Sequence, residues 1–417
     1  MSPLYIKSFY LIGGMVVSAL FGFLFWMLAA RSATAADVGL TSAALASSNL
    51  LLVLCELGLG TALVYFAGLK PDRVVALVNG IVRAGWMTIS TATIVFLLGM
   101  RFWSPGLAPI SDSALLILSY AAFTTLNHIL ALQDVAMLSQ GRARYIFWRT
   151  LACNVPSVAL LVPLVALLGA QHGLMLAYFL PNIAVGLFVG AVVLPRQFSG
   201  YRFFGRFDRD VLGQVATYGS SNHVGNLFWG LPAYILPLVA VNTLTAAETG
   251  HFAISWTIAN FVLIAPRMIA FALFTEAAQD PNGLRARASH AMLLILALVT
   301  PVVLVLWLVG EHILGFFGQE YVQLSLLRML LISVVPFSIN SVFFVMLRVH
   351  RQLKHLLLFS GSIALAILGS TITLVPWLRA DGIAASWLVG HMLAAVWAAM
   401  TVSRLSSMRP HNVKVNL

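Results

Sequence analysis

Three charged residues lie inside long apolar stretches of the sequence, namely Glu56, Arg83 and Arg267. A charged side chain at the centre of a bilayer costs about 2.5–3.5 kcal/mol on insertion scales, so such residues usually face a partner or a cavity. Glu56 and Arg83 lie at similar depths in consecutive stretches, roughly 15 Å from the loop between them at about 1.5 Å per residue. We therefore predict that they pair, either to fix a helical hairpin or to handle a substrate or a proton.

Arg267 follows Pro266, which removes a helix hydrogen bond and can kink the helix. A kinked, charged stretch is typical of a cavity lining, so Arg267 is predicted to be functional. Asp134 and Arg328 lie nearer the ends of their stretches, where an arginine can reach the interface. A structural role is the simpler interpretation for both residues, and they remain candidates for coupling and for substrate binding, respectively. Arg149 is predicted at the inner interface.

Two amides form a polar face in an otherwise apolar stretch. Asn222 and Asn226 are four residues apart, so they share one side of a helix. A polar face in lipid must meet another helix or water. Hydrogen bonding between helices and binding of a sugar both explain this face.

The composition indicates that lipid surrounds most of the chain. Of the 417 residues, 60% are hydrophobic and 9% are charged, whereas soluble domains carry about 25% charged residues. A helix needs roughly 20 apolar residues to cross the hydrocarbon core. We therefore predict an all-α integral membrane protein of about twelve transmembrane helices. The predicted spans are residues 9–30, 40–66, 74–100, 113–139, 150–169, 173–193, 212–240, 251–278, 289–309, 322–347, 356–375 and 382–403.

The basic residues predict the orientation of these spans. With the N-terminus inside, 18 of the 24 Lys and Arg residues fall on the inner side and 3 on the outer side. This distribution satisfies the positive-inside rule and places both termini in the cytoplasm. The net charge of +11 is thereby explained by topology, so no nucleic-acid partner is expected.

The longest loop divides the predicted spans into two sets of six. Both sets then enter the membrane from the same side, which predicts two parallel six-helix lobes around a central cavity that holds the substrate path. The predicted domains are an N-lobe (1–195), a basic cytoplasmic linker (196–211), a C-lobe (212–405) and a cytoplasmic tail (406–417).

The sequence lacks the signatures of enzyme chemistry. It contains no nucleotide-binding loop of the Walker type, no metal-ligand cluster and no loop large enough for a transferase site. A secondary transporter without catalytic residues, metal or cofactor is therefore favoured. An ion gradient is the expected energy source, worth about 2.3 kcal/mol per charge per 100 mV.

Several short segments carry a family resemblance. They are Glu56–Ala62, Gln140–Arg142, Gly219–His223, Leu236–Leu238, Ala246–Ala253, Ala265–Pro266, Leu273–Phe274, Phe317–Tyr321 and Leu327–Leu330. Together they resemble the polysaccharide and O-antigen flippases of the multidrug/oligosaccharidyl-lipid/polysaccharide exporter superfamily. The resemblance extends over nearly the whole chain. The fourteen spans usual in the peptidoglycan-precursor branch of that superfamily disfavour that branch.

The resemblance implies a protein of the bacterial inner membrane that exports polyprenyl-diphosphate-linked oligosaccharides by alternating access. A proton or sodium ion would drive export, and a polysaccharide polymerase or assembly proteins are candidate partners. Arginine suits a diphosphate because its planar fork binds phosphate oxygens in pairs. The predicted substrate-binding residues are Arg83, Arg267, Arg328, Asn222 and Asn226. The predicted coupling residues are Glu56 and Asp134. Glu56 departs from the cationic cavity of the family, because it would neutralise Arg83 or act as a switch.

Two other interpretations remain. A cation-coupled drug or small-solute antiporter is suggested by residues 68–73, which partly match a loop motif of major facilitator transporters. The match ends at Val74 and Val75, where that motif continues with glycine and a basic residue. A membrane-embedded glycosyltransferase or an assembly scaffold is less favoured, because the outer loops offer only short segments such as residues 310–323.

Overall fold

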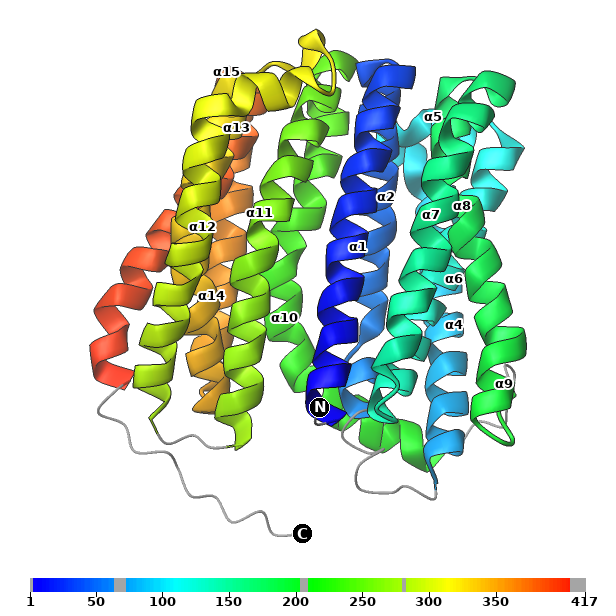
Figure 1. Cartoon of the computed structure of the whole chain (residues 1–417), viewed down its shortest axis with the longest axis vertical. Coiled ribbons are helices and arrows are strands. Elements are labelled where there is room, and N and C mark those ends of the chain that lie inside the picture. Colours follow the sequence, from blue (N-terminus) through cyan, green and yellow to red (C-terminus); the bar gives the residue numbers. More distant parts are fainter. Residues whose placement is uncertain (1–2, 64–72, 203–208, 280–282, 406–417) are drawn as a thin grey trace. The chain divides into compact units, whose positions relative to one another are not determined.

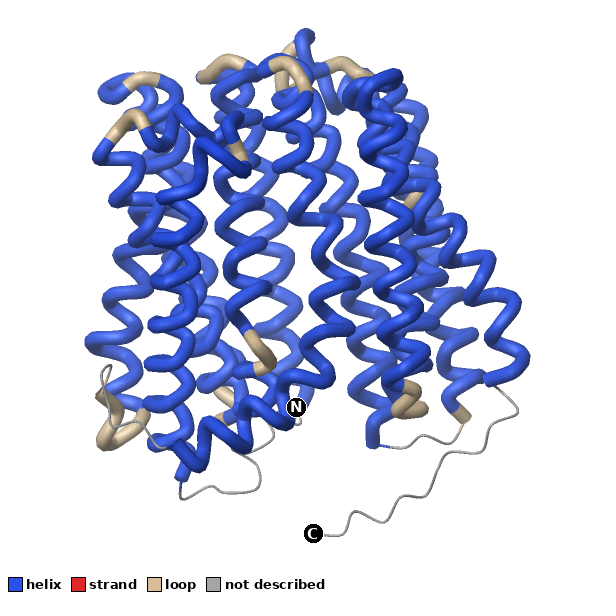
Figure 2. Tube along the Cα trace, turned by 180° about the vertical axis from the view of Figure 1, so that it is seen from behind, coloured by secondary structure: helices blue, strands red, loops and turns tan. Residues whose placement is uncertain are grey.

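A computed structural model describes residues 3–63, 73–202, 209–279 and 283–405 of the chain. Within these residues the backbone is helical, and none of it forms a strand (Figure 2). Eleven segments in this part are long and apolar enough to cross a membrane. The last of them, α15 (Leu353–Leu405), holds two helices joined at Arg379, whose φ of 55° and ψ of −129° are not helical. The predicted all-α fold with about twelve spans is therefore confirmed.

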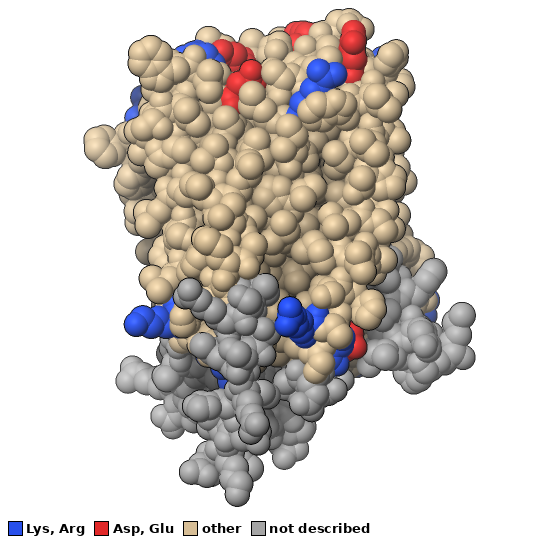
Figure 3. Space-filling model, turned by 90° about the vertical axis from the view of Figure 1, so that its left-hand side faces the viewer, with Lys and Arg blue, Asp and Glu red and all other residues tan. Residues whose placement is uncertain are grey.

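The surface agrees with a position in a bilayer. On the face shown in Figure 3, charged side chains lie near the two ends of the helices, and the broad band between them carries uncharged residues. Large apolar side chains of the long helices are exposed, for example Leu98 at 84%, Leu308 at 79% and Ile372 at 77%. Only a hydrocarbon solvent makes such exposure favourable over so large a surface. The chain is a multi-pass membrane protein.

The structure divides into two compact units. Unit 1 comprises residues 1–223 and 237–250, and unit 2 comprises residues 224–236 and 251–417. The helices of unit 1 are α1 (Pro3–Ser32), α2 (Ala35–Glu56), α4 (Val74–Trp103), α5 (Ala108–Ser111), α6 (Ala114–Ser139), α7 (Ala143–Leu168), α8 (Ala170–Phe188) and α9 (Leu194–Gln197). In this unit α7 packs along both α1 and α8, and α6 packs against α4 and α8 (Figure 1).

Unit 2 is a second helical bundle. Its helices are α12 (Leu284–Gly315), α13 (Leu324–Ile332), α14 (Val334–Val349) and α15. In this unit α14 packs against α12 and α15, and aromatic contacts such as Phe343–Phe359, with centroids 4.9 Å apart, join α14 to α15. Helices α10 (Arg209–Thr243) and α11 (Ala246–Gln279) contribute residues to both units.

The turn between α10 and α11 belongs to unit 1, and the predicted linker at 196–211 stays a prediction. Residues 237–250, at the turn between α10 and α11, group with unit 1. Hydrogen bonds explain this grouping, because Asn242 accepts the backbone N–H of Gly106 at 2.9 Å and donates to Ser104 at 3.0 Å. The start of the predicted linker is likewise held in unit 1, where the Asn79 amide accepts the N–H of Arg202 at 3.1 Å.

A repeated sequence begins one long helix in each half of the chain. Residues 34–39 read Thr-Ala-Ala-Asp-Val-Gly, and residues 245–250 read Thr-Ala-Ala-Glu-Thr-Gly. Both form capping boxes, in which the threonine hydroxyl accepts a backbone N–H three residues on and the acidic side chain accepts the N–H of the threonine. These similar sequences with the same local structure indicate an internal repeat, with α2 and α11 as equivalent helices.

The two repeated glycines lie against each other within unit 1. A Cβ atom added to Gly39 would be 2.8 Å from the backbone nitrogen of Gly250. A Cβ atom on Gly250 would be 2.2 Å from the carbonyl oxygen of Ala35. Only glycine permits backbones to approach this closely, as is typical of helix contacts in membranes.

Candidate functional site

Glu56 lies at a break in the second span. Helix α2 ends at Glu56, Leu57 adopts a left-handed conformation with φ 47°, and helical structure resumes at residue 59. The carboxylate accepts the backbone N–H of Gly58 at 2.9 Å and that of Gly60 at 3.0 Å. These N–H groups open the resumed helix, so they stabilise a negative charge at this point. A broken helix of this kind is a device by which transporters bind ions within the membrane.

A histidine completes the surroundings of this carboxylate. Nδ1 of His223, on α10, lies 2.9 Å from Oε2 of Glu56, and both residues belong to unit 1. His223 is buried, and its Nε2 atom has no hydrogen-bond partner in the part of the chain that the structure describes. The ion pair shown for Glu56 is thus with His223. Arg83 is half-buried on α4, and its predicted pairing with Glu56 stays a prediction.

Asp134 pairs with a basic residue of the next span. The Arg149 Nη2 atom donates to Oδ2 of Asp134 at 2.6 Å, which joins α6 to α7. The side chains of Asp134 and Arg149 are 16% and 20% exposed, respectively, so little solvent screens the pair. This contact is consistent with a structural role for Asp134, and both its structural and its coupling role stay predictions.

Arg267 has a different environment within unit 2. It follows Pro266 on α11, as the sequence shows, and its Nη2 atom donates to Oδ1 of Asn260 at 3.3 Å. The Asn260 amide donates to the carbonyl oxygen of Trp256 at 2.9 Å, which directs its own oxygen toward Arg267. Among the described residues, no carboxylate forms an ion pair with Arg267. Its positive charge therefore lacks an acidic counter-charge in this part of the structure.

Aromatic side chains surround the guanidinium of Arg267. Its central carbon lies 5.3 Å from the ring centroid of Phe337, within the range of a cation–π contact. Phe337 in turn contacts Trp387 and His391, with centroids 6.1 and 5.1 Å away. Asn340, on α14, donates to the carbonyl oxygen of His391, on α15, at 2.8 Å, so these two helices are held together here. The result is a rigid, buried wall beside a half-buried cation.

Glu56 and Arg267 occupy equivalent positions in the two repeats. Each residue lies seventeen positions after the glycine that ends the repeated motif, Gly39 in one half and Gly250 in the other. The first half therefore places an acid where the second half places a base. The two positions cannot serve the same ligand in the same way, because they carry opposite charges.

The remaining predicted residues are placed as follows. Asn226 is exposed on α10, while the side chain of Asn222 lies outside the described residues. Arg328 is half-buried at the middle of α13, with its guanidinium carbon 5.1 Å from the ring centroid of Trp307. The predicted cytoplasmic tail (406–417) also lies outside the described residues. Of the predicted site residues, the structure therefore shows close partners for Glu56, Asp134, Arg267 and Arg328.

Sequence reasoning missed His223 and Asn260 as partners of the two central charges. A signal for His223 was present, because it lies about as deep in the seventh span as Glu56 does in the second. Asn260 lies seven residues before Arg267, two helical turns away, which places it on the same face. No cluster of three or more His, Cys, Asp or Glu residues that could hold a metal occurs in the described part of the chain.

Comparison with known proteins shows the fold of the chain. No protein-family profile and no curated protein matches the sequence. A solved inward-facing multidrug resistance MATE family transporter of the MOP superfamily matches with a TM-score of 0.71 and 15% identity, over 95% of this chain and 99% of that one. An outward-facing MATE transporter matches with a TM-score of 0.64 and 16% identity, over 98% and 97%.

A third solved structure is a MOP superfamily transporter from Pyrococcus furiosus, described as having a binding pocket of reversed polarity that suggests a different function. It matches with a TM-score of 0.64 and 15% identity, over 97% of this chain and 96% of that one. Because these sequence identities are low, the likeness establishes the fold alone. The chain has the two-lobed helical fold of MATE transporters of the MOP superfamily.

Proposed function

We propose that the chain is an exporter of an anionic, lipid-linked oligosaccharide that works by ion-coupled alternating access. The observation that carries the proposal is the environment of Arg267. The two acidic residues described above, Glu56 and Asp134, have basic partners, whereas Arg267 has no carboxylate partner among the described residues. A guanidinium without a counter-ion in an apolar span suits a ligand that brings its own negative charge, such as a diphosphate.

The coupling role in this proposal belongs to Glu56 and His223. A carboxylate at a helix break, hydrogen-bonded to an imidazole, can bind a proton or a metal cation and release it again. Arg83 and Arg328 would add positive charge along the path of the diphosphate. Asn226, with Asn222, would contact the sugar. The transported species would be a polyprenyl-diphosphate-linked repeat unit of a bacterial envelope polysaccharide, moved across the inner membrane.

Proteoliposomes provide the test. A fluorescent polyprenyl-diphosphate oligosaccharide is incorporated, and a leaflet-specific quencher reports its movement with and without a proton or sodium gradient. We expect gradient-dependent movement that Arg267→Gln reduces at least about tenfold, the effect of 1.4 kcal/mol. Arg348→Gln is the matched control, because Arg348 is also a half-buried arginine of unit 2 but lies at the end of α14 against Phe274. Unchanged movement in Arg267→Gln would contradict the proposal.

A drug antiporter is the second candidate. The MATE structures that share the fold are described as multidrug resistance transporters. The Glu56 carboxylate is 29% exposed and would attract an organic cation. Efflux of a cationic dye from the same proteoliposomes, lost in Glu56→Gln and retained in Arg267→Gln, would favour this function over the first.

A further inference from the structure

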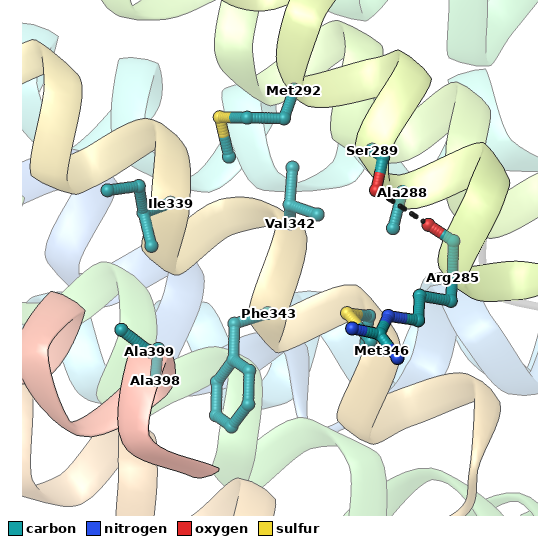
Figure 4. A pocket seen from close by; sticks show the side chains of 10 residues that line it. All are labelled: Arg285, Ala288, Ser289, Met292, Ile339, Val342, Phe343, Met346, Ala398 and Ala399. Carbon is teal, nitrogen blue, oxygen red and sulfur yellow. Dashed lines mark hydrogen bonds between the residues drawn. The ribbon is translucent and has the colours of Figure 1, made fainter. Parts of the chain in front are cut away.

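A cavity in unit 2 is lined by none of the candidate site residues. Its volume is about 260 Å³, and it is enclosed by α12, α14 and the last part of α15. The side chains that line it are Arg285, Ala288, Ser289, Met292, Ile339, Val342, Phe343, Met346, Ala398 and Ala399 (Figure 4). Eight of these ten residues are apolar, and the two polar ones, Arg285 and Ser289, come from the first turns of α12.

The polar and apolar parts of this lining are separated along the helices. Arg285 is the second residue of α12, so it lies at the membrane surface, while Met292 lies about 10 Å farther into the bilayer at 1.5 Å per residue. On α14, Met346 and Ile339 are separated by the same distance. Figure 4 shows the Arg285 side chain extending toward Met346, with Met292 and Ile339 at the other end of the cavity. The cavity therefore has a cationic mouth and an apolar interior.

The cavity is also open to molecules from outside unit 2. Arg285, Ser289 and Ala399 are exposed, and Met292 and Ile339 are half-buried. The Ser289 hydroxyl donates to the carbonyl oxygen of Arg285 at 3.0 Å, which leaves its oxygen able to accept a hydrogen bond. Unlike Arg287, which pairs with Glu276 at 3.7 Å, Arg285 forms no ion pair with another described residue.

We infer that this cavity binds an anionic glycerophospholipid of the leaflet that meets the Arg285 end of the bundle. The phosphate and the anionic headgroup lie at Arg285, and one acyl chain lies along Met292, Ile339 and Val342. A basic side chain above an apolar space between helices is complementary to a molecule that is anionic at one end and apolar at the other. A soluble anion would leave the apolar interior empty, and a neutral lipid would leave Arg285 unpaired.

Native mass spectrometry of the detergent-solubilised full chain tests this inference. Dioleoyl phosphatidylglycerol and dioleoyl phosphatidylcholine are titrated separately, and the first lipid bound is measured. We expect tighter binding of phosphatidylglycerol, weakened about fivefold in Arg285→Gln, the effect of one basic residue near an anionic lipid. Arg287→Gln is the matched control, since it removes the same charge from the same helix outside the cavity. Equal losses in both variants, or no preference for phosphatidylglycerol, would overturn the inference.

A second pair of variants tests the apolar part of the cavity. Ala399→Trp fills it from its exposed edge, and Met400→Trp places the same ring at a neighbouring position, 63% exposed, that does not line it. We expect Ala399→Trp alone to reduce phosphatidylglycerol binding. A dimer that only Ala399→Trp abolishes would instead identify a second copy of the chain as the occupant and overturn the inference.

Photolabelling of the unmodified protein provides a measurement that needs no variant. Phosphatidylglycerol with a diazirine in its acyl chain is incorporated, irradiated, and located by peptide mapping. We expect labels on the peptides that contain Met292 and Ile339. Labels confined to other helices would overturn the inference.

Discussion

Nδ1 of His223 lies 2.9 Å from Oε2 of Glu56, although 167 residues separate the two along the chain. The same carboxylate accepts backbone N–H groups from Gly58 and Gly60, so three nitrogen atoms surround it. The N–H groups and the imidazole replace the hydration that the carboxylate loses within the membrane. This arrangement also ties the seventh span to the break in the second, both within unit 1.

The contact predicts energetic coupling between Glu56 and His223. We expect Glu56→Gln and His223→Asn each to lower the apparent unfolding temperature. The double variant should unfold at nearly the same temperature as the less stable of the two single variants. Residues in direct contact show interaction energies of about 0.5–3 kcal/mol. The measurement is thermal unfolding of the four proteins in detergent at one scan rate, because membrane proteins often unfold irreversibly. Simple additivity of the two losses would show that the pair does not act as a unit.

The Asp134–Arg149 pair is expected to stabilise unit 1. Removing one partner of a buried pair leaves a charge without compensation and costs about 3–5 kcal/mol. Because the two side chains keep some exposure, we expect Asp134→Asn to cost about 3 kcal/mol at most. The measurement is the midpoint of thermal aggregation, followed by fluorescence-detected size exclusion.

An exposed pair of the same chemistry supplies the control for this prediction. Arg101 and Asp112 also form an ion pair in unit 1, but their side chains are 68% and 63% exposed. Exposed pairs contribute about 0–1 kcal/mol, so Asp112→Asn should change the midpoint little. If Asp112→Asn and Asp134→Asn have equal effects, burial is not what gives the Asp134 pair its importance.

The sequence predicted the spans well because hydrocarbon imposes their length and composition. Most predicted spans overlap one long helix, whereas the second is broken after Glu56 and the tenth holds both α13 and α14. The two last spans are separated at Arg379, where the backbone leaves the helical conformation. The division into units was less predictable. Hydropathy shows only that residues 237–250 connect two spans. The hydrogen bond from the Asn242 side chain to Ser104 holds that turn in unit 1.

The sequence predicted the charged residues of the candidate site but not the residues that contact them. Glu56 and Arg267 were found because charges in apolar stretches are costly and therefore rare. The partner of Glu56 was sought in the adjacent span, at the same depth. His223 has a similar depth but is far along the chain, and sequence alone cannot choose between residues at one depth. The absence of an ion pair at Arg267 in the described part depends on tertiary packing that no local pattern encodes.

The contact between the repeated glycines predicts sensitivity to a single methyl group. In Gly250→Ala the new Cβ atom would lie 2.2 Å from the backbone oxygen of Ala35, so α2 and α11 must move apart. Such overpacking costs about 1–3 kcal/mol. The matched control is Gly369→Ala, where no atom lies within 4 Å and alanine should stabilise the helix by about 1 kcal/mol. Thermal unfolding in detergent measures both, and opposite signs are expected.

Asn260 offers a way to change the charge beside Arg267 without removing the arginine. In Asn260→Asp a carboxylate oxygen replaces the amide oxygen that already accepts from Arg267 at 3.3 Å, while the hydrogen bond from the amide to the carbonyl oxygen of Trp256 is lost. Opposite charges about 4 Å apart attract by about 4 kcal/mol at an effective dielectric constant of 20. Arg267 would then be neutralised by the protein itself.

Two consequences follow for Asn260→Asp if Arg267 binds an anionic substrate. The variant should keep about the stability of the parent protein, because the ion pair that it gains offsets the hydrogen bond to Trp256 that it loses. Its transport of a polyprenyl-diphosphate substrate should nevertheless fall at least about tenfold. Asn260→Ala should lower transport less, because the arginine keeps its charge and loses only its orientation. Flipping in proteoliposomes and thermal unfolding separate these effects. A stable Asn260→Asp protein that transports the anionic lipid normally, or that gains efflux of a cationic dye, would assign Arg267 to a different ligand.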